Sequence, residues 1–66
     1  MKIIVNGKEL EVTNNITVLE LIKSLKIEDK VMATALNMNI VKKDNWSKQT
    51  IKDGDKLEFL HFVGGG

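Results

Sequence analysis

The last six residues of the chain, HFVGGG at positions 61–66, raise the first chemical question that the sequence poses. Glycine has no side chain to pack, and it loses more backbone entropy on ordering than any other residue. A terminal run of three glycines therefore contributes nothing to a hydrophobic core. The tail is either incidental or the working part of the molecule.

Other side chains that could do chemistry are few. The chain holds one histidine (His61), two serines, and no cysteine or tyrosine. A catalytic nucleophile needs a neighbouring base and a third group that orients the base, so these residues favour a non-enzymatic protein. Asp53 and Asp55 flank Gly54 but lack the full set of oxygen ligands of a calcium loop, which favours a turn over a metal site.

The charged residues are balanced and scattered along the chain. Ten lysines face nine acidic residues, arginine is absent, and the net charge is +1. Nucleic-acid readers use clustered cations and the bidentate fork of arginine, so we do not expect nucleic-acid binding. No stretch is long enough for a signal-peptide core or a membrane span. We expect a cytoplasmic protein with no membrane contact.

The elements that must position this tail begin with a β-hairpin. Asn6-Gly7 stands between two runs of alternating polarity, which is the strongest short-range hairpin signal. A two-residue turn there pairs Ile3 with Leu10 on a mostly apolar face. The opposite face of this hairpin then carries charged residues.

A helix is predicted after the hairpin. Thr17, followed three residues later by Glu20, has the spacing of a capping box, in which each side chain bonds a backbone N–H at the helix start. The apolar residues beyond it recur at i, i+3, i+4 and i+7, which predicts one stripe on a helix of about ten residues. This stripe consists of Val18, Leu21, Ile22 and Leu25.

Three further strands follow. The apolar run 31–36 predicts a strand, 40–41 a short one, and the alternating run 56–63 a last strand. A hairpin, a helix across one face and a last strand beside the first make an α+β domain, with a mixed sheet of about four to five strands. We place this domain at residues 1–63 and a flexible glycine tail at 64–66.

Large apolar residues near the end of the chain predict a docking surface. Alternation turns Leu57 and Phe59 toward the core, which leaves Leu60 and Phe62 on the opposite face beside the tail. Two large apolar side chains on that face favour partner binding over chance exposure. Trp46 is interpreted as a lid over the edge of the core, since a small domain has few large residues.

These segments, taken in order, resemble the ThiS/MoaD family of sulfur carriers, in particular its ThiS members, which have a ubiquitin-like β-grasp fold. Each segment alone is weak, but their order and spacing over all 66 residues are specific. The resemblance rests on Asn6-Gly7-Lys8, Thr17-Val18-Leu19-Glu20-Leu21, Ala35-Leu36-Asn37, Ile40-Val41, Trp46, Asp53-Gly54-Asp55 and Gly65-Gly66.

The resemblance implies a protein carrier with no bound cofactor. In this family a ThiF-like adenylyltransferase uses ATP to activate the terminal carboxylate, and the acyl adenylate is converted to a thiocarboxylate. The sulfur comes from a cysteine desulfurase or another donor, and it passes to thiazole synthase for the thiazole ring of thiamine. The resemblance assigns the modified carboxylate to Gly66, with Gly64 and Gly65 as the tail that carries it.

Two alternatives remain open from the sequence. The small subunit of molybdopterin synthase shares fold and chemistry but is typically longer and has prolines before its glycines, whereas this chain has no proline. A non-covalent β-grasp interaction module would make the glycines incidental. One departure from the family pattern is Lys42-Lys43, where proline and arginine are common.

Overall fold

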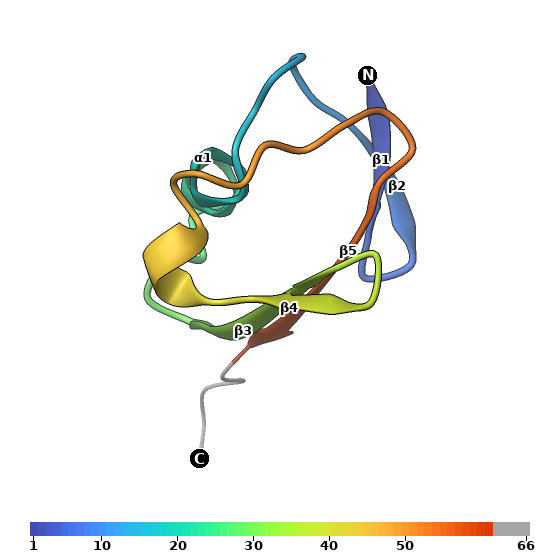
Figure 1. Ribbon diagram of the computed structural model, residues 1–66. Helices are drawn as coiled ribbons and strands as arrows, with labels where there is room; N and C mark the ends of the chain where they lie inside the picture. Colours follow the sequence, from blue (N-terminus) through green and yellow to red (C-terminus); the bar gives the residue numbers. More distant parts are fainter. Residues whose placement is uncertain (62–66) are drawn as a thin grey trace.

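The computed structural model describes residues 1–61, which form five strands, one α-helix and one short 3₁₀ helix. Figure 1 shows a sheet that curves around one side of the α-helix. The predicted boundary between the domain and the glycine tail, at residues 63 and 64, lies outside the described residues. The elements are β1 (Lys2–Val5), β2 (Lys8–Glu11), α1 (Val18–Ser24), β3 (Val31–Leu36), β4 (Asn39–Val41), η1 (Lys43–Asn45) and β5 (Lys56–His61).

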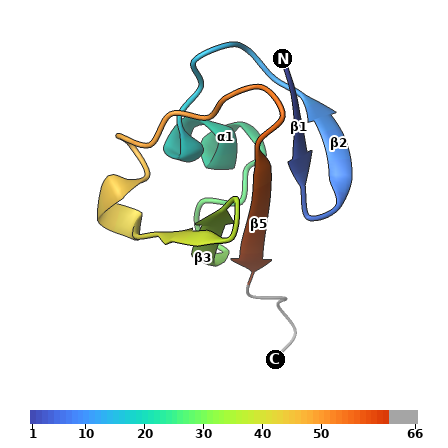
Figure 2. The same ribbon diagram turned by 45° about the vertical axis from the view of Figure 1, so that its right-hand side comes forward.

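The strands lie in the order β2-β1-β5-β3-β4, so the last strand of the chain is the central one. β1 and β5 run parallel, whereas the β1–β2, β3–β4 and β3–β5 pairs are antiparallel. The expected mixed sheet with one helix on one face is confirmed. Figure 2 shows β5 between the β1–β2 hairpin and β3, so β5 joins the two hairpins into one sheet.

The first hairpin has the predicted register. Ile3 lies opposite Leu10, and the turn residues Asn6 and Gly7 have φ angles of 49° and 83°. Positive φ at both turn positions is the type I′ geometry, whose twist matches that of the flanking strands. Ile3 is 1% exposed, whereas Leu10 is only partly buried because β2 is an edge strand of the sheet.

The predicted capping box is present at the start of α1. The Thr17 N–H donates to the Glu20 side chain at 2.9 Å, and the Glu20 N–H donates to Thr17 Oγ1 at 3.1 Å. The expected length of about ten residues is wrong, since α1 has seven. The chain leaves the helix early because Lys26 adopts a φ of 60° and the N–H groups of Lys26 and Ile27 bond carbonyls of the last turn.

The core fills the space between α1 and the concave face of the sheet. Val18, Leu21 and Ile22 of the predicted helix stripe are each 0% exposed, while the fourth member, Leu25, caps the helix and is partly buried. The buried apolar residues are Ile3, Val18, Leu21, Ile22, Val31, Val41, Trp46, Ile51, Leu57 and Phe59.

One polar side chain lies in this core. Thr34 on β3 is 1% exposed, and its Oγ1 has no hydrogen-bond partner among the residues that the structure describes. Burying an unpaired hydroxyl costs about 1 to 3 kcal/mol. We expect Thr34→Val to raise the free energy of unfolding by about 1 kcal/mol in urea titrations. The exposed Thr13→Val is the control, with a change within about 0.5 kcal/mol, and a loss of stability in Thr34→Val would contradict the prediction.

Candidate functional site

The convex face of the sheet, opposite α1, carries an apolar patch. β3 contributes Ala33 and Ala35, which lie opposite Leu60 on β5 and Ile40 on β4 respectively. Ile40 is 71% exposed and Leu60 is 61% exposed. We call Ala33, Ala35, Ile40 and Leu60 the outer patch. All four residues line a shallow depression of about 380 Å³.

The sequence prediction for the last strand is confirmed in its orientation. Leu57 and Phe59 are buried at 0% and 6% exposure, and Leu60 lies on the opposite face. The role of Leu60 in partner binding stays a prediction. Phe62, its predicted companion, lies outside the described residues, as do the tail glycines Gly64, Gly65 and Gly66.

Sequence reasoning missed Ile40 and the two alanines of the outer patch. The faces of the run 31–36 do not follow simple alternation, because the register between β3 and β5 shifts between Val31 and Ala33. Val31 and Thr34 are therefore both buried although they are three positions apart. The signal that was present in the sequence is the pair of small residues Ala33 and Ala35, which stand two positions apart and so lie on the same face of β3.

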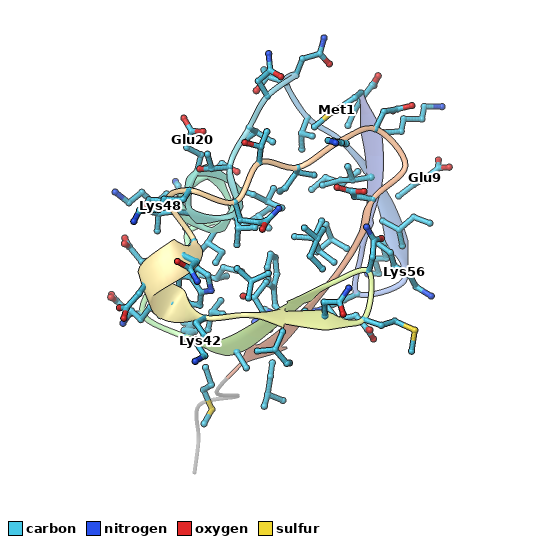
Figure 3. The ribbon with its side chains drawn as sticks, in the orientation of Figure 1. Met1, Glu9, Glu20, Lys42, Lys48 and Lys56 are labelled. Carbon is cyan, nitrogen blue, oxygen red and sulfur yellow. The ribbon has the colours of Figure 1, made fainter. Side chains whose placement is uncertain are left out.

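Two lysines lie near β4, the strand that carries Ile40 of the outer patch. Figure 3 shows Lys42 and Lys56 toward opposite ends of β4, and both residues are exposed. Glu58, which lines the depression, is the acidic residue among its lining groups. Lys43 has a different environment, since its Nζ lies 6.0 Å from the ring centroid of Trp46. The two residues of the Lys42-Lys43 pair therefore have different surroundings.

The other candidate groups have structural contacts. The predicted turn is present at Asp53-Gly54, and Asp55 accepts the Lys52 N–H within it at 2.8 Å. Asp53 accepts the Lys2 N–H at 2.8 Å, which ties the turn to β1. His61 is partly exposed at the end of β5, and its Nε2 lies 3.4 Å from the amide of Asn6. Within residues 1–61, no helix has the length and apolar character needed to cross a membrane.

Comparisons with known proteins extend over the whole chain. The sequence model of the ThiS family matches residues 3–66. A thiazole synthase of Paramagnetospirillum magneticum is 36% identical over 66 residues, which is all of this chain but only 20% of that protein. The sulfur carrier protein ThiS of Bacillus subtilis is 32% identical over 62 residues, covering 92% of this chain and 94% of that protein.

A solved structure gives the same result for the fold. The crystal structure of the thiamine biosynthesis protein ThiS from Geobacter metallireducens matches with a TM-score of 0.83 at 37% identity, and the match covers all of both chains. The expected ubiquitin-like β-grasp fold is thereby confirmed. Both the sequence match and the structural match cover the elements that carry the outer patch, and the chain belongs to the ThiS family.

Proposed function

We propose that the chain is a sulfur carrier of thiamine biosynthesis and that it acts through a thiocarboxylate formed on Gly66. The observation that carries the proposal is that the match to the ThiS family runs to residue 66 and so includes the terminal glycines. Residues 64–66 are glycines, which have no side chain, and the chain contains no cysteine that could carry sulfur instead. The chain is a co-substrate of its partners and holds no cofactor of its own.

The chemistry follows from the poor reactivity of a carboxylate toward nucleophiles. A carboxylate oxygen of Gly66 attacks the α-phosphate of ATP, and pyrophosphate leaves. Sulfide attacks the acyl carbon directly, and AMP leaves with the oxygen that joined it to the carbonyl. A persulfide donor attacks in the same way, and a second thiol then breaks the S–S bond of the acyl disulfide to release the thiocarboxylate. The activating partner is a ThiF-like adenylyltransferase, which binds the ATP, and the sulfur comes from a cysteine desulfurase or another donor. The use of ATP supports a cytoplasmic location.

The glycines suit entry into the active site of a partner. Residues 63–66 span about 13 Å when fully extended, at about 3.3 Å per residue. Glycine has no Cβ, so a narrow channel accepts this segment where it would exclude larger residues. In this proposal the partners bind the folded residues 1–61, and the last glycines bring the Gly66 carboxylate to the ATP in the active site.

The receiver of the sulfur in this proposal is thiazole synthase. A segment similar to this chain lies within a protein that is itself named thiazole synthase. A carrier joined to a synthase meets it at a high effective concentration, which is an arrangement expected of two parts that work together. This observation supports thiazole synthase as a partner of the separate chain.

The outer patch is the proposed contact surface for the activating enzyme. We expect the double variant Ile40→Ser/Leu60→Ser to weaken binding by about 2 kcal/mol or more, roughly 30-fold, in titration calorimetry. Both side chains are already exposed, so the melting temperature should change little. Met38→Ser is the matched control, since Met38 is 85% exposed at the β3–β4 turn and does not line the depression. Unchanged affinity in the double variant would contradict this assignment.

The proposed function is tested by intact mass. The purified chain, incubated with ATP, a ThiF-like enzyme and sulfide, should gain the mass of one oxygen exchanged for one sulfur. A thiol alkylating reagent should then add once, because the unmodified chain contains no cysteine. No mass gain under conditions that modify a known carrier would overturn the proposal. Growth of a strain that lacks its thiamine sulfur carrier, but not of one that lacks its molybdopterin carrier, assigns the pathway.

A further inference from the structure

Two asparagines hold the central strand β5 from opposite sides. Asn6 and Asn37 each have a φ of 49° and each begins a two-residue turn in which the next residue also has a positive φ. Asparagine tolerates the left-handed conformation, so turn geometry explains why this residue type is accepted there. Turn geometry alone does not explain the side-chain contacts that both residues make with β5.

Asn37 fastens the first residues of β5. Its Oδ1 accepts the Lys56 N–H at 2.9 Å, and its Nδ2 donates to Asp55 Oδ1 at 3.0 Å. Its backbone N–H also donates to the Lys56 carbonyl at 2.7 Å. The tip of the β3–β4 hairpin is thereby tied to the start of β5, at the end opposite His61.

Asn6 fastens the last described residues of β5. Its backbone N–H donates to the Leu57 carbonyl at 2.9 Å, and its Oδ1 accepts the Phe59 N–H at 2.8 Å. Its Nδ2 lies 3.4 Å from the Phe59 carbonyl and 3.4 Å from His61 Nε2. Because β1 pairs with β5 only through Ile4 and Val5, the Asn6 amide extends this pairing one step beyond the point where β1 turns away.

The pairing of β5 with β3, on the side of β5 away from Asn6, is irregular near the same residues of β5. The register of β3 against β5 shifts between Val31 and Ala33, opposite the end of β5. The side chain of Asn6 is therefore a direct restraint on the segment 59–61 at a place where the neighbouring ladder is distorted. This segment contains Leu60 of the outer patch, and residues 62–66 follow it in the chain.

We propose that Asn6 is a positioning residue for sulfur transfer: through Phe59 and His61 it sets the orientation of Leu60 on the outer patch and the position of His61, the last described residue before the segment that ends at Gly66. This inference rests on the proposed function. Leu60 stands between Phe59 and His61 in the chain, so a shift of the segment 59–61 moves Leu60 relative to Ala33, its partner on β3. Misplacement of a reacting group by about 1 Å can lower a rate 100-fold.

The test compares Asn6→Gly with Asn37→Gly as a matched control. Glycine keeps the positive φ of either turn and removes only the amide, so both variants lose side-chain bonds to β5. In ATP–pyrophosphate exchange with a ThiF-like enzyme, we expect Asn6→Gly to raise the KM for the carrier at least fivefold and Asn37→Gly less than twofold. Asn6→Asp keeps an oxygen for the Phe59 N–H and should stay within twofold of the parent chain.

A second measurement needs no partner. Amide hydrogen exchange at Phe59 should accelerate at least tenfold in Asn6→Gly, whereas in Asn37→Gly the acceleration should fall on Lys56. The kinetic assay is run at low temperature, and circular dichroism measures the folded fraction of each variant. The KM is then calculated from the concentration of folded carrier, so that partial unfolding does not raise the apparent KM. Equal KM values for Asn6→Gly and Asn37→Gly, measured while the parent chain is active, would overturn the positioning role of Asn6 but not the proposed function. A parent chain that is never adenylated would overturn the proposed function itself.

Discussion

Removal of Gly65 and Gly66 is expected to abolish adenylation and sulfur labelling while leaving the folded domain intact. The truncated chain ends at Gly64, so its carboxylate stops about 7 Å short of the normal position at about 3.3 Å per residue. No binding energy of the outer patch can compensate, because the reacting atom is then out of reach of the α-phosphate. Intact mass and a thiol alkylating reagent measure the loss of labelling. A melt by circular dichroism should show nearly the parent melting temperature, because glycine has no side chain to pack and removal of terminal residues is usually tolerated.

Gly65→Ala is the control that separates length from shape. This variant restores the full reach of the tail and adds a single Cβ, so it should still be labelled, at a lower rate if the partner encloses the tail in a narrow channel. A truncated chain that is still labelled would show that the sulfur is carried elsewhere and would make the tail incidental. A truncated chain that no longer folds would instead place the tail inside the domain and contradict the boundary at residues 63 and 64.

The parts of the fold that the sequence predicted depend on local signals. Asn6-Gly7 fixed both the position and the register of the first hairpin, because a type I′ turn admits only one pairing of the flanking strands. The Thr17 and Glu20 pair located the start of α1, since a capping box involves residues only three positions apart. Alternation in the last strand correctly turned Leu60 away from the core.

The parts that the sequence did not predict depend on distant contacts or on unusual backbone. Lys26 ends α1 in a left-handed conformation that glycine normally signals, so the predicted helix was too long. The shifted register at Val31 and Ala33 hid which side of β3 faces the core. The bond between Asn6 and Phe59 joins residues 53 positions apart, so no local pattern could reveal it.

Trp46→Ala is expected to lower the free energy of unfolding by about 3 to 5 kcal/mol, which is the usual cost of deleting a buried large aromatic side chain. Trp46 is 2% exposed, and its Nε1 donates to the Val41 carbonyl at 2.9 Å. Its own carbonyl accepts the Leu19 N–H at 3.0 Å, so this one residue connects the η1 segment with both β4 and α1. A domain of this size has about 3 to 5 kcal/mol of stability from its core, so the variant should be largely unfolded in circular dichroism at 25 °C.

Trp46→Phe separates the packing of the ring from its hydrogen bond. Phenylalanine keeps most of the apolar contacts but leaves the buried Val41 carbonyl without the indole donor, which costs about 1 to 3 kcal/mol. Because Trp46 belongs to the core and does not line the depression on the convex face, we expect folded Trp46→Phe to equal the parent chain in measured affinity for the activating enzyme and in sulfur labelling. Urea titration measures the first effect and calorimetry the second. A loss of less than about 1 kcal/mol in the free energy of unfolding of Trp46→Ala would contradict the assignment of Trp46 to the core. Weakened binding by folded Trp46→Phe would show that the contact surface extends from the convex face to the region around Trp46.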